Sequence, residues 1–197
     1  MNEPLSDSAL DQMFRSARSV NKFTERVVDD ATLQQLYALY RWGPTSMNCQ
    51  PCRVVFVRTA EAKERLKPAL MPNNVAKTTA APVTAIIAFD SSFFEELPTQ
   101  FPAVPGARDM FTSNPALAAE TAMRNSTLQG AYLILAARAM GLDAGPMSGF
   151  AAPLIDAAFF PDGRWKANFL VNLGWGDPTG NRPRGPRLAF EEAVRIA

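Results

Sequence analysis

The run Pro82-Val83-Thr84-Ala85-Ile86-Ile87-Ala88-Phe89 decides the fold, because it is an uncharged, apolar strand pattern introduced by a proline. Residues 54–57, which read Val-Val-Phe-Val, form a second pattern of the same kind. Strands of this type are buried on both faces, so their sheet needs helices on either side. The sequence therefore predicts an α+β sandwich in which helices cover both faces of a central sheet.

Start and stop signals place the first helices. Ser6 can cap a helix that runs to about Ala17, and Asp29 or Asp30 can cap a second one that Gly43-Pro44 ends. The second stretch carries apolar residues at helical spacing, which is typical of an amphipathic helix.

Further helices follow the first strand. Thr59 opens a charged helix that Pro68 interrupts, and Asn114-Pro115 starts a long alanine-rich helix that ends at Gly141. One face of the long helix is small and apolar, as expected where helices pack closely, and consists of Leu128, Ala131, Tyr132 and Leu135.

Residues 91–114 break these patterns, because phenylalanines alternate there with prolines. We expect this segment to be an irregular, partly mobile cover. The tail at 177–186 is rich in Pro, Gly and Arg and is predicted not to pack on the core of its own subunit. The other expected elements are a short strand at 142–144, a loop at 145–150, a short helix at 153–160 and a core strand at 168–174.

Composition limits the possible functions. A chain of 197 residues that is 47% hydrophobic is long enough for one well-buried domain, and no linker divides residues 1–197. The net charge of +1 argues against binding nucleic acid. No segment approaches the roughly 18 apolar residues that span a bilayer. We expect a cytoplasmic protein without membrane or nucleic-acid partners.

The chain contains no histidine. This excludes Ser-His-Asp and Cys-His relays and zinc sites with imidazole ligands. The acidic residues are mostly isolated, and no metal site or catalytic side chain is indicated. If the protein is an enzyme, a cofactor carries its chemistry.

The polar turn Pro44-Thr45-Ser46-Met47-Asn48-Cys49-Gln50-Pro51 separates a predicted helix from a predicted strand. Its hydroxyl and amide side chains, held between prolines, suit a flat polar heterocycle. Cys49 and Cys52 also match C-x-x-C, which keeps a dithiol oxidoreductase as an alternative. A strand follows instead of the helix whose N-terminus would stabilise a thiolate, so the redox hypothesis is weak.

Several distant segments together predict an anion site. Arg18, Ser19 and Asn21 follow the first helix, and Asn74 and Lys77 share a helix face three residues apart. Arg182, Arg184 and Arg187 lie near the end of the chain, and the loop at 145–149 adds backbone amides. There is no G-x-G-x-x-G or G-K-[ST] motif, so side chains must hold any phosphate.

The sequence resembles the FMN-dependent nitroreductases. Residues 17–23 are similar to the family's N-terminal phosphate motif, residues 44–51 to its Pro-Ser-Ser-x-Asn-x-Gln-Pro motif, and residues 141–150 to a third family segment. Trp42–Ser46, Lys77–Ile86 and Gly145–Phe150 look most like the malonic-semialdehyde reductase branch of pyrimidine utilisation. Ala17, Asn21 and Cys52 depart from the family pattern, so phosphate binding leans on Arg18, Lys77 and Arg187.

The resemblance implies a three-layer sandwich with a mostly antiparallel sheet, in a homodimer that exchanges its C-terminal segments and binds FMN at the interface. Arg18, Ser19, Asn21, Lys77 and Arg187 would hold the phosphate and ribityl chain, with Arg184 as a further candidate. Asn74 would lie near the pyrimidine edge of the ring, and Lys77 is the candidate cation there. The ring would be lined near N5 and O4 by Pro146, Met147, Ser148 and Gly149, and the partner would contribute Pro44, Thr45, Ser46 and Asn48.

The implied reaction is a ping-pong transfer of hydride from NADPH or NADH through flavin N5. The leading substrate is a small aldehyde such as malonic semialdehyde, which gives 3-hydroxypropanoate, and Arg108 or Arg124 could supply a cation for its carboxylate. A quinone or nitroarene is the alternative substrate. A dithiol oxidoreductase and a non-catalytic binding domain are the other two hypotheses.

Overall fold

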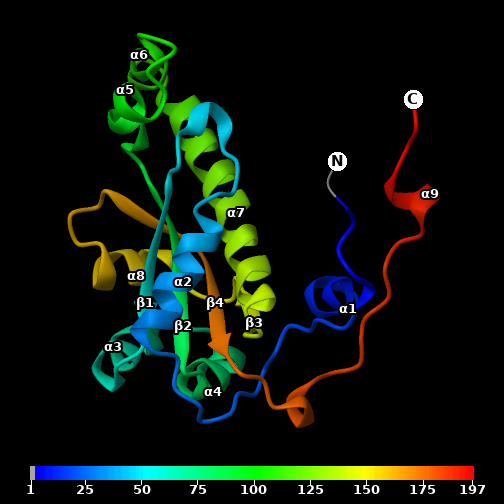
Figure 1. The fold of residues 1–197 in the computed structure, drawn as a ribbon. Coiled ribbons are helices and arrows are strands. Elements are labelled where there is room, and N and C mark those ends of the chain that lie inside the picture. The colour runs from blue at the N-terminus through cyan, green and yellow to red at the C-terminus, as the bar shows by residue number, and fades with distance from the viewer. Residues whose placement is uncertain (1–2) are drawn as a thin grey trace.

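The computed structural model describes residues 3–197 and is built around a sheet with the order β1-β2-β4-β3 (Figure 1). The strands are β1 (Cys52–Val57), β2 (Val83–Asp90), β3 (Asp143–Met147) and β4 (Trp165–Gly174). Each neighbouring pair is antiparallel, as the resemblance implies. β2 is buried along nearly its whole length, whereas β1 is an edge strand that buries only Val57 fully. The expectation that both strands are fully buried is therefore wrong for β1.

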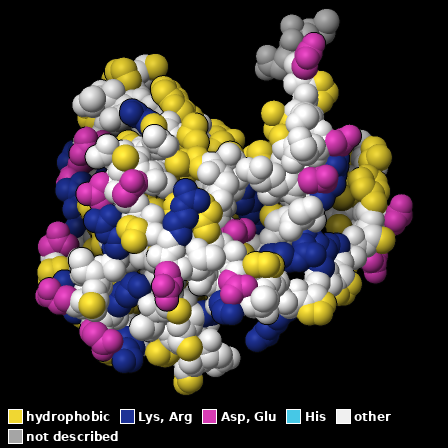
Figure 2. All heavy atoms as spheres, turned by 60° about the horizontal axis from the view of Figure 1, so that its bottom comes forward, with side chains coloured by type: hydrophobic (Ala, Val, Ile, Leu, Met, Phe, Trp, Pro, Cys, Tyr) yellow, Lys and Arg dark blue, Asp and Glu magenta, His cyan; other side chains and the backbone are white. Residues whose placement is uncertain are grey.

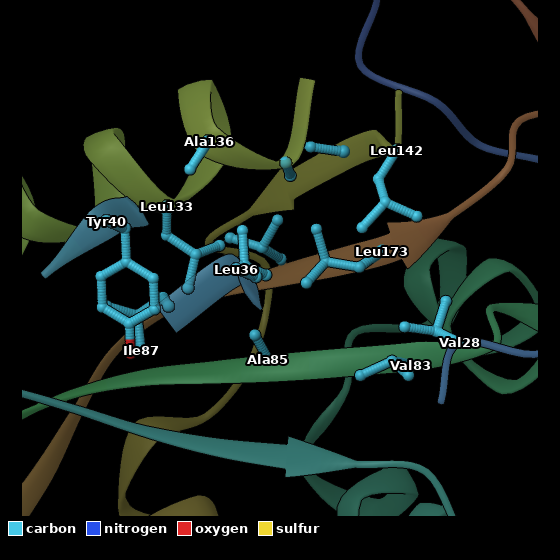
Figure 3. Packing of buried hydrophobic residues seen from close by; sticks show 13 residues of the cluster. Val28, Leu36, Tyr40, Val83, Ala85, Ile87, Leu133, Ala136, Leu142 and Leu173 are labelled. Carbon is cyan, nitrogen blue, oxygen red and sulfur yellow. The ribbon is translucent and has the colours of Figure 1, made fainter. Parts of the chain in front are cut away.

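Helices cover both faces of the sheet. α2 (Asp30–Tyr40) and α7 (Pro115–Ala139) cover one face, and α3 (Ala60–Leu66), α4 (Pro72–Ala80) and α8 (Ala152–Phe159) contribute to the other. Ala85 and Ile87 pack against Leu36 and Leu133 (Figure 3), whereas the alternate residue Ile86 faces the α3 and α8 side. Two-sided burial of β2 explains its unbroken apolar sequence and confirms the three-layer α+β sandwich.

The predicted capping residues of four helices are confirmed. Ser6 Oγ accepts a hydrogen bond from Ala9 N at 3.3 Å, and Asp29, Thr59 and Asn114 cap their helices in the same way. The first helix is shorter than expected, because α1 (Asp7–Leu10) continues as a π-helical turn, η1 (Asp11–Arg15). The remaining short helices are η2 (Ser46–Asn48), η3 (Lys67–Ala69), η4 (Phe93–Glu96), α5 (Leu97–Gln100), α6 (Ala107–Thr112), η5 (Pro178–Gly180) and α9 (Phe190–Ala193).

The segment at 91–114 is more regular than predicted. It folds into η4, α5 and α6 around a cluster that contains buried Phe93 and Phe111, whose rings meet edge to face at 5.0 Å. Pro98 lies in the first turn of α5, where a missing N–H is tolerated. Contacts between the phenylalanines therefore organise a segment whose prolines suggested irregular structure.

Two other expectations are corrected. Residues 145–147, expected in a loop, belong to β3 and pair with β4, where Pro146 is tolerated because β3 is an edge strand. The face of α7 that contains Leu128 and Tyr132 packs only partly within the chain: Tyr132 lies against Gly43, but Leu128 and Tyr132 remain 45% and 40% exposed. α7 instead turns Gly130 and Leu133 toward the sheet, where a Cβ on Gly130 would lie 2.5 Å from Phe169 Cζ.

The C-terminal segment leaves the sandwich after β4. Residues 181–197 are all exposed and run beside the N-terminal segment, so the two ends of the chain form an arm on one side of the molecule (Figure 1). This agrees with the predicted failure of the tail to pack on its own core. Within residues 3–197, no helix is long and apolar enough to cross a membrane.

Candidate functional site

A basic crevice lies between the body of the protein and the arm. It has a volume of about 440 Å³, and no acidic residue of the described chain lines it. Figure 2 shows Lys and Arg side chains gathered where the arm meets the body. The lining residues are Phe14, Ala17, Arg18, Ser19, Asn21, Arg138, Arg182, Pro183, Arg184, Gly185 and Arg187.

Backbone contacts bring the two ends of the chain to this crevice. Val20 N donates to Ala144 O at 3.1 Å, which fixes the segment after η1 beside β3. Arg184 reaches across from the tail and donates to Ala17 O at 2.8 Å. Arg18 and Arg187 donate only to backbone carbonyls near them in sequence. Their guanidinium groups are therefore not neutralised by carboxylates.

Lys77 extends the crevice toward α4. Its Nζ lies 3.4 Å from Asn21 Oδ1, the acceptor of its hydrogen bond. Burial lowers the pKa of Lys77, and the nearby charge of Arg182 lowers it further. Because like charges repel and burial disfavours them, this cluster is best stabilised by a bound anion.

Arg138, at the C-terminal end of α7, is a crevice residue that the sequence reasoning missed. Its Nη1 donates to Met13 O at 2.9 Å, but its buried Nε has no hydrogen-bond partner. Burial lowers the pKa of this guanidinium, Asp143 opposes that shift, and Arg184 adds to it. A basic residue in the last turn of the predicted long helix was the available signal.

The predicted residues of α4 lie against the end of β3. Asn74 Nδ2 donates to Gly149 O at 2.8 Å, and a Cβ on Gly149 would lie only 2.5 Å from that nitrogen. Thr78 Oγ1 lies 3.6 Å from Met147 Sδ. Asn74 and Lys77 are three residues apart on this helix, so the segment Pro146–Gly149 is close to the basic crevice.

The polar turn at 44–51 lies elsewhere in the chain. Ser46 N donates to Asn125 Oδ1 at 2.8 Å, and Asn48 Nδ2 donates to Gln100 O at 2.9 Å. Asn125 and Arg138 are 13 positions apart on α7, which is about 20 Å along a helix. Figure 1 shows α5 and α4 at opposite ends of the sheet. One chain therefore does not bring Pro44, Thr45, Ser46 and Asn48 to the crevice, and their contribution from a partner stays a prediction.

The cysteines are poorly suited to redox catalysis. Cys49 is buried beneath the 91–114 segment, and Cys52 is the first residue of β1. Burial raises the pKa of Cys49 to about 11 and that of Cys52 to about 12, so neither thiol forms much thiolate at neutral pH. Among residues 3–197, no group of three or more Cys, Asp or Glu side chains is arranged to hold a metal ion.

Comparisons with known proteins identify the fold and the family. A protein from Exiguobacterium sibiricum, solved in complex with FMN, superposes with a TM-score of 0.84 over 100% of both chains at 20% identity. CLA-ER, an enone reductase of gut-bacterial fatty acid saturation metabolism, gives 0.83 at 21% identity over 98% of this chain and 99% of that one. These structures share the fold. The family model described as "Nitroreductase family" matches residues 14–175, and the chain therefore belongs to the nitroreductase family.

Proposed function

We propose that this flavin oxidoreductase binds FMN in the basic crevice, uses NADPH or NADH as its reductant and reduces a small aldehyde such as malonic semialdehyde to 3-hydroxypropanoate. The observation that carries the proposal is the crevice lined by five arginines and no acid. Bound FMN would supply hydride transfer at N5, in a ping-pong reaction. The whole chain, residues 1–197, would act as one FMN-binding domain.

The crevice residues fit a phosphate group. Arg18, Arg184 and Arg187 offer guanidinium donors that no carboxylate occupies, and Lys77 adds an ammonium group. Ser19 and Asn21 add neutral donors and complete the predicted phosphate and ribityl site. The unpartnered Nε of Arg138 indicates an acceptor that the protein itself does not supply. Charge-assisted bonds from arginine suit phosphate better than the glycine-rich loop that this chain lacks.

The surface beside the crevice would hold the isoalloxazine ring. Asn74 is oriented by its bond to Gly149, which leaves its carbonyl oxygen free to accept a hydrogen bond from the ring edge. Backbone groups of Pro146, Met147, Ser148 and Gly149 would face the same ring. Lys77 would place a positive charge near it and stabilise negative charge that develops on reduction.

We further propose that the active form is a homodimer. Trp42 is 77% exposed, and the apolar side chains of Leu39, Met123, Leu128 and Tyr132 are also exposed on the neighbouring helices. Exposed apolar surface of this kind favours a protein partner. A second copy packed there would supply the turn at 44–48 to the crevice, and the exposed tail could clasp the partner.

The aldehyde substrate rests on the resemblance of Trp42–Ser46 and Lys77–Ile86 to one branch of the family. Arg108 Nη1 lies 3.7 Å from Asp109 Oδ1, and Arg124 forms an ion pair with Glu120. Each arginine that could bind the carboxylate of the substrate therefore already faces a carboxylate of the protein. Two small, mostly apolar cavities, of about 230 and 280 Å³, are lined wholly or partly by the 91–114 segment and favour the alternative of a flat quinone or nitroarene. A substrate panel decides between these classes.

Absorption spectroscopy tests the proposal directly. The purified protein is expected to be yellow and to bleach on addition of NADPH or NADH under nitrogen, after which aldehydes, quinones and nitroarenes are compared as oxidants. A colourless protein that cannot be reconstituted with FMN would refute the assignment. Flavin that binds but is reduced by neither nicotinamide would instead favour a non-catalytic binding protein.

A further inference from the structure

Backbone strain is concentrated in the turn between α2 and β1. Met47, Asn48 and Gln50 have φ angles of 53°, 50° and 39°, in the left-handed region that residues with a side chain rarely adopt. Among residues 3–197, these three are the only non-glycine residues with positive φ. Such a conformation persists only where surrounding groups hold it.

Two amide side chains from α7 hold the two ends of this turn. Asn125 Oδ1 accepts a hydrogen bond from Ser46 N at 2.8 Å, and Gln129 Oε1 accepts one from Cys52 N at 3.0 Å. The two side chains lie four residues apart, on one face of the helix. The strained residues lie between the two anchored backbone amides.

Both anchors are buried, with Asn125 3% and Gln129 4% exposed. A buried amide is costly unless it is hydrogen-bonded, so these residues do not serve as simple core packing. Asn125 Nδ2 donates to Thr121 O at 2.8 Å, which fixes the amide with its oxygen toward the turn. The bonds between the turn and Gln100 are exposed, where water can replace them.

We propose that Asn125 and Gln129 are positioning residues, which hold the turn in the strained shape that presents Thr45, Ser46 and Asn48 to FMN. The inference rests on the proposed function, because it takes the turn to be a wall of the flavin site. Without either anchor the backbone would relax toward negative φ, and the polar side chains of the turn would point elsewhere. Neither amide needs to touch the flavin.

Matched substitutions test this role. Gln129→Met keeps the length of the side chain and removes the acceptor. Gln129→Glu keeps an acceptor oxygen, and Gln129 and Arg53 line one cavity of about 270 Å³, so a cation is close to the new carboxylate. Asn125→Leu removes the second acceptor. Thr127→Val is the control, because it removes two hydrogen bonds of another α7 side chain, to Met123 O and from Asn168 Nδ2, that do not involve the turn.

Two readouts separate positioning from general stability. Amide hydrogen exchange of the apoprotein should accelerate about tenfold at Cys52 in Gln129→Met and at Ser46 in Asn125→Leu. FMN affinity, followed by flavin fluorescence, should fall about tenfold in the same two variants and stay within about threefold in Gln129→Glu and in the control. Thermal unfolding of the apoproteins confirms that each variant is folded.

The outcomes distinguish this inference from the proposed function. Unchanged exchange at Ser46 and Cys52, or unchanged FMN affinity in both acceptor-deleted variants, overturns the positioning role. If the wild-type protein binds no FMN, the proposed function is overturned, and so is the role of the turn in contacting flavin. The exchange experiment then still decides whether the two amides hold the turn.

Discussion

The most deeply buried charge in the described chain belongs to Asp90, whose side chain is 1% exposed. Its two carboxylate oxygens accept bonds from Arg53 Nη2 and Arg164 Nε, each at 2.9 Å. Arg53 lies in β1, Asp90 ends β2, and Arg164 immediately precedes β4, so one carboxylate joins three strands at one end of the sheet.

We expect Asp90→Ala to lower the free energy of unfolding by about 3 kcal/mol, because it leaves Arg53 without its counter-charge and leaves Arg164 with Glu95 as its only carboxylate partner in the described chain. Urea denaturation of the apoprotein measures the change. Glu120→Ala, which removes an exposed partner of Arg124, is the matched control and should cost less than about 1 kcal/mol. Equal effects of the two substitutions would contradict a structural role for the buried carboxylate.

Arg187 is one of the three cations on which the predicted phosphate site depends. Arg187→Ala should weaken FMN binding by about 1.5–3 kcal/mol, the contribution of a charge-assisted hydrogen bond, and should release flavin on dilution. Fluorescence titration gives the affinity. Arg195→Ala changes an exposed arginine of the same tail that does not line the crevice, so it should bind FMN normally. Unchanged affinity in Arg187→Ala would remove Arg187 from the site.

The buried thiols make stability sensitive to alkaline pH. Burial raises the pKa of Cys49 and Cys52 from 9.0 to about 11 and about 12, so the folded state holds these protons when the unfolded state has lost them. The contribution of the two protonated thiols to the free energy of unfolding is complete below pH 9 and is lost as pH rises to about 12. We expect the Cys49→Ser and Cys52→Ser double variant to lose less stability between pH 8 and 10.5 than wild type. An equal loss of stability in the variant and the wild type over this pH range, measured by denaturation, would rule this out. The same variant should retain its turnover at neutral pH.

At the scale of elements, local signals were predictable and contacts between distant segments were not. The caps at Ser6, Asp29, Thr59 and Asn114 depend on residues within one turn, and the sequence located all of them. The extension of β3 through Pro146 and Met147 depends on pairing with β4, which no local pattern reveals. The phenylalanine contacts that order the 91–114 segment are non-local in the same sense.

The same distinction applies to the candidate site. Arg18, Asn21, Lys77 and Arg187 stood out because several short basic or polar motifs resembled one family, and the fold brings them to one crevice. Arg138 lies outside these motifs, and its place in the crevice depends on the contact between the end of α7 and the arm. The hydrogen bonds from the turn at 44–51 to Asn125 and Gln129 could likewise be found only in the structure, because buried amides on a helix have no sequence signature.

Gly130 tests how closely α7 packs on the sheet. Alanine normally favours a helix by about 1 kcal/mol over glycine, but a Cβ here would lie 2.5 Å from Phe169 Cζ and 3.1 Å from Ile87 Cγ2. We expect Gly130→Ala to lower the free energy of unfolding by about 1–3 kcal/mol through overpacking. A denaturation experiment measures the sign of this change. A gain in stability would contradict overpacking and would mean that the Phe169 ring can move aside. Ala131→Gly, at an exposed neighbour, isolates the propensity effect.

At the scale of the whole molecule, the chain has two surfaces that its own fold leaves incomplete. The crevice contains cationic residues of the predicted phosphate site, and the turn at 44–48 lies far from it along α7. The exposed apolar side chains of α2 and α7 lie between these two regions in sequence and cover one outer face. A two-fold dimer through that face would supply the turn of each chain to the crevice of the other.

We therefore expect wild-type protein to be a dimer and the Leu128→Glu and Tyr132→Glu double variant to be a monomer, because four buried charges at a two-fold interface cannot be desolvated without counter-ions. Sedimentation with detection of flavin absorbance follows mass and cofactor together. Leu154→Glu places a charge at a similarly exposed leucine of α8, on the opposite face of the sheet, and this variant should remain a flavin-bound dimer.

If both halves of the site must meet across the interface, the monomer loses its flavin even though its crevice is intact. A folded monomer that retains FMN with wild-type affinity would show instead that the crevice of a single chain is sufficient, and would remove the turn at 44–48 from the binding site.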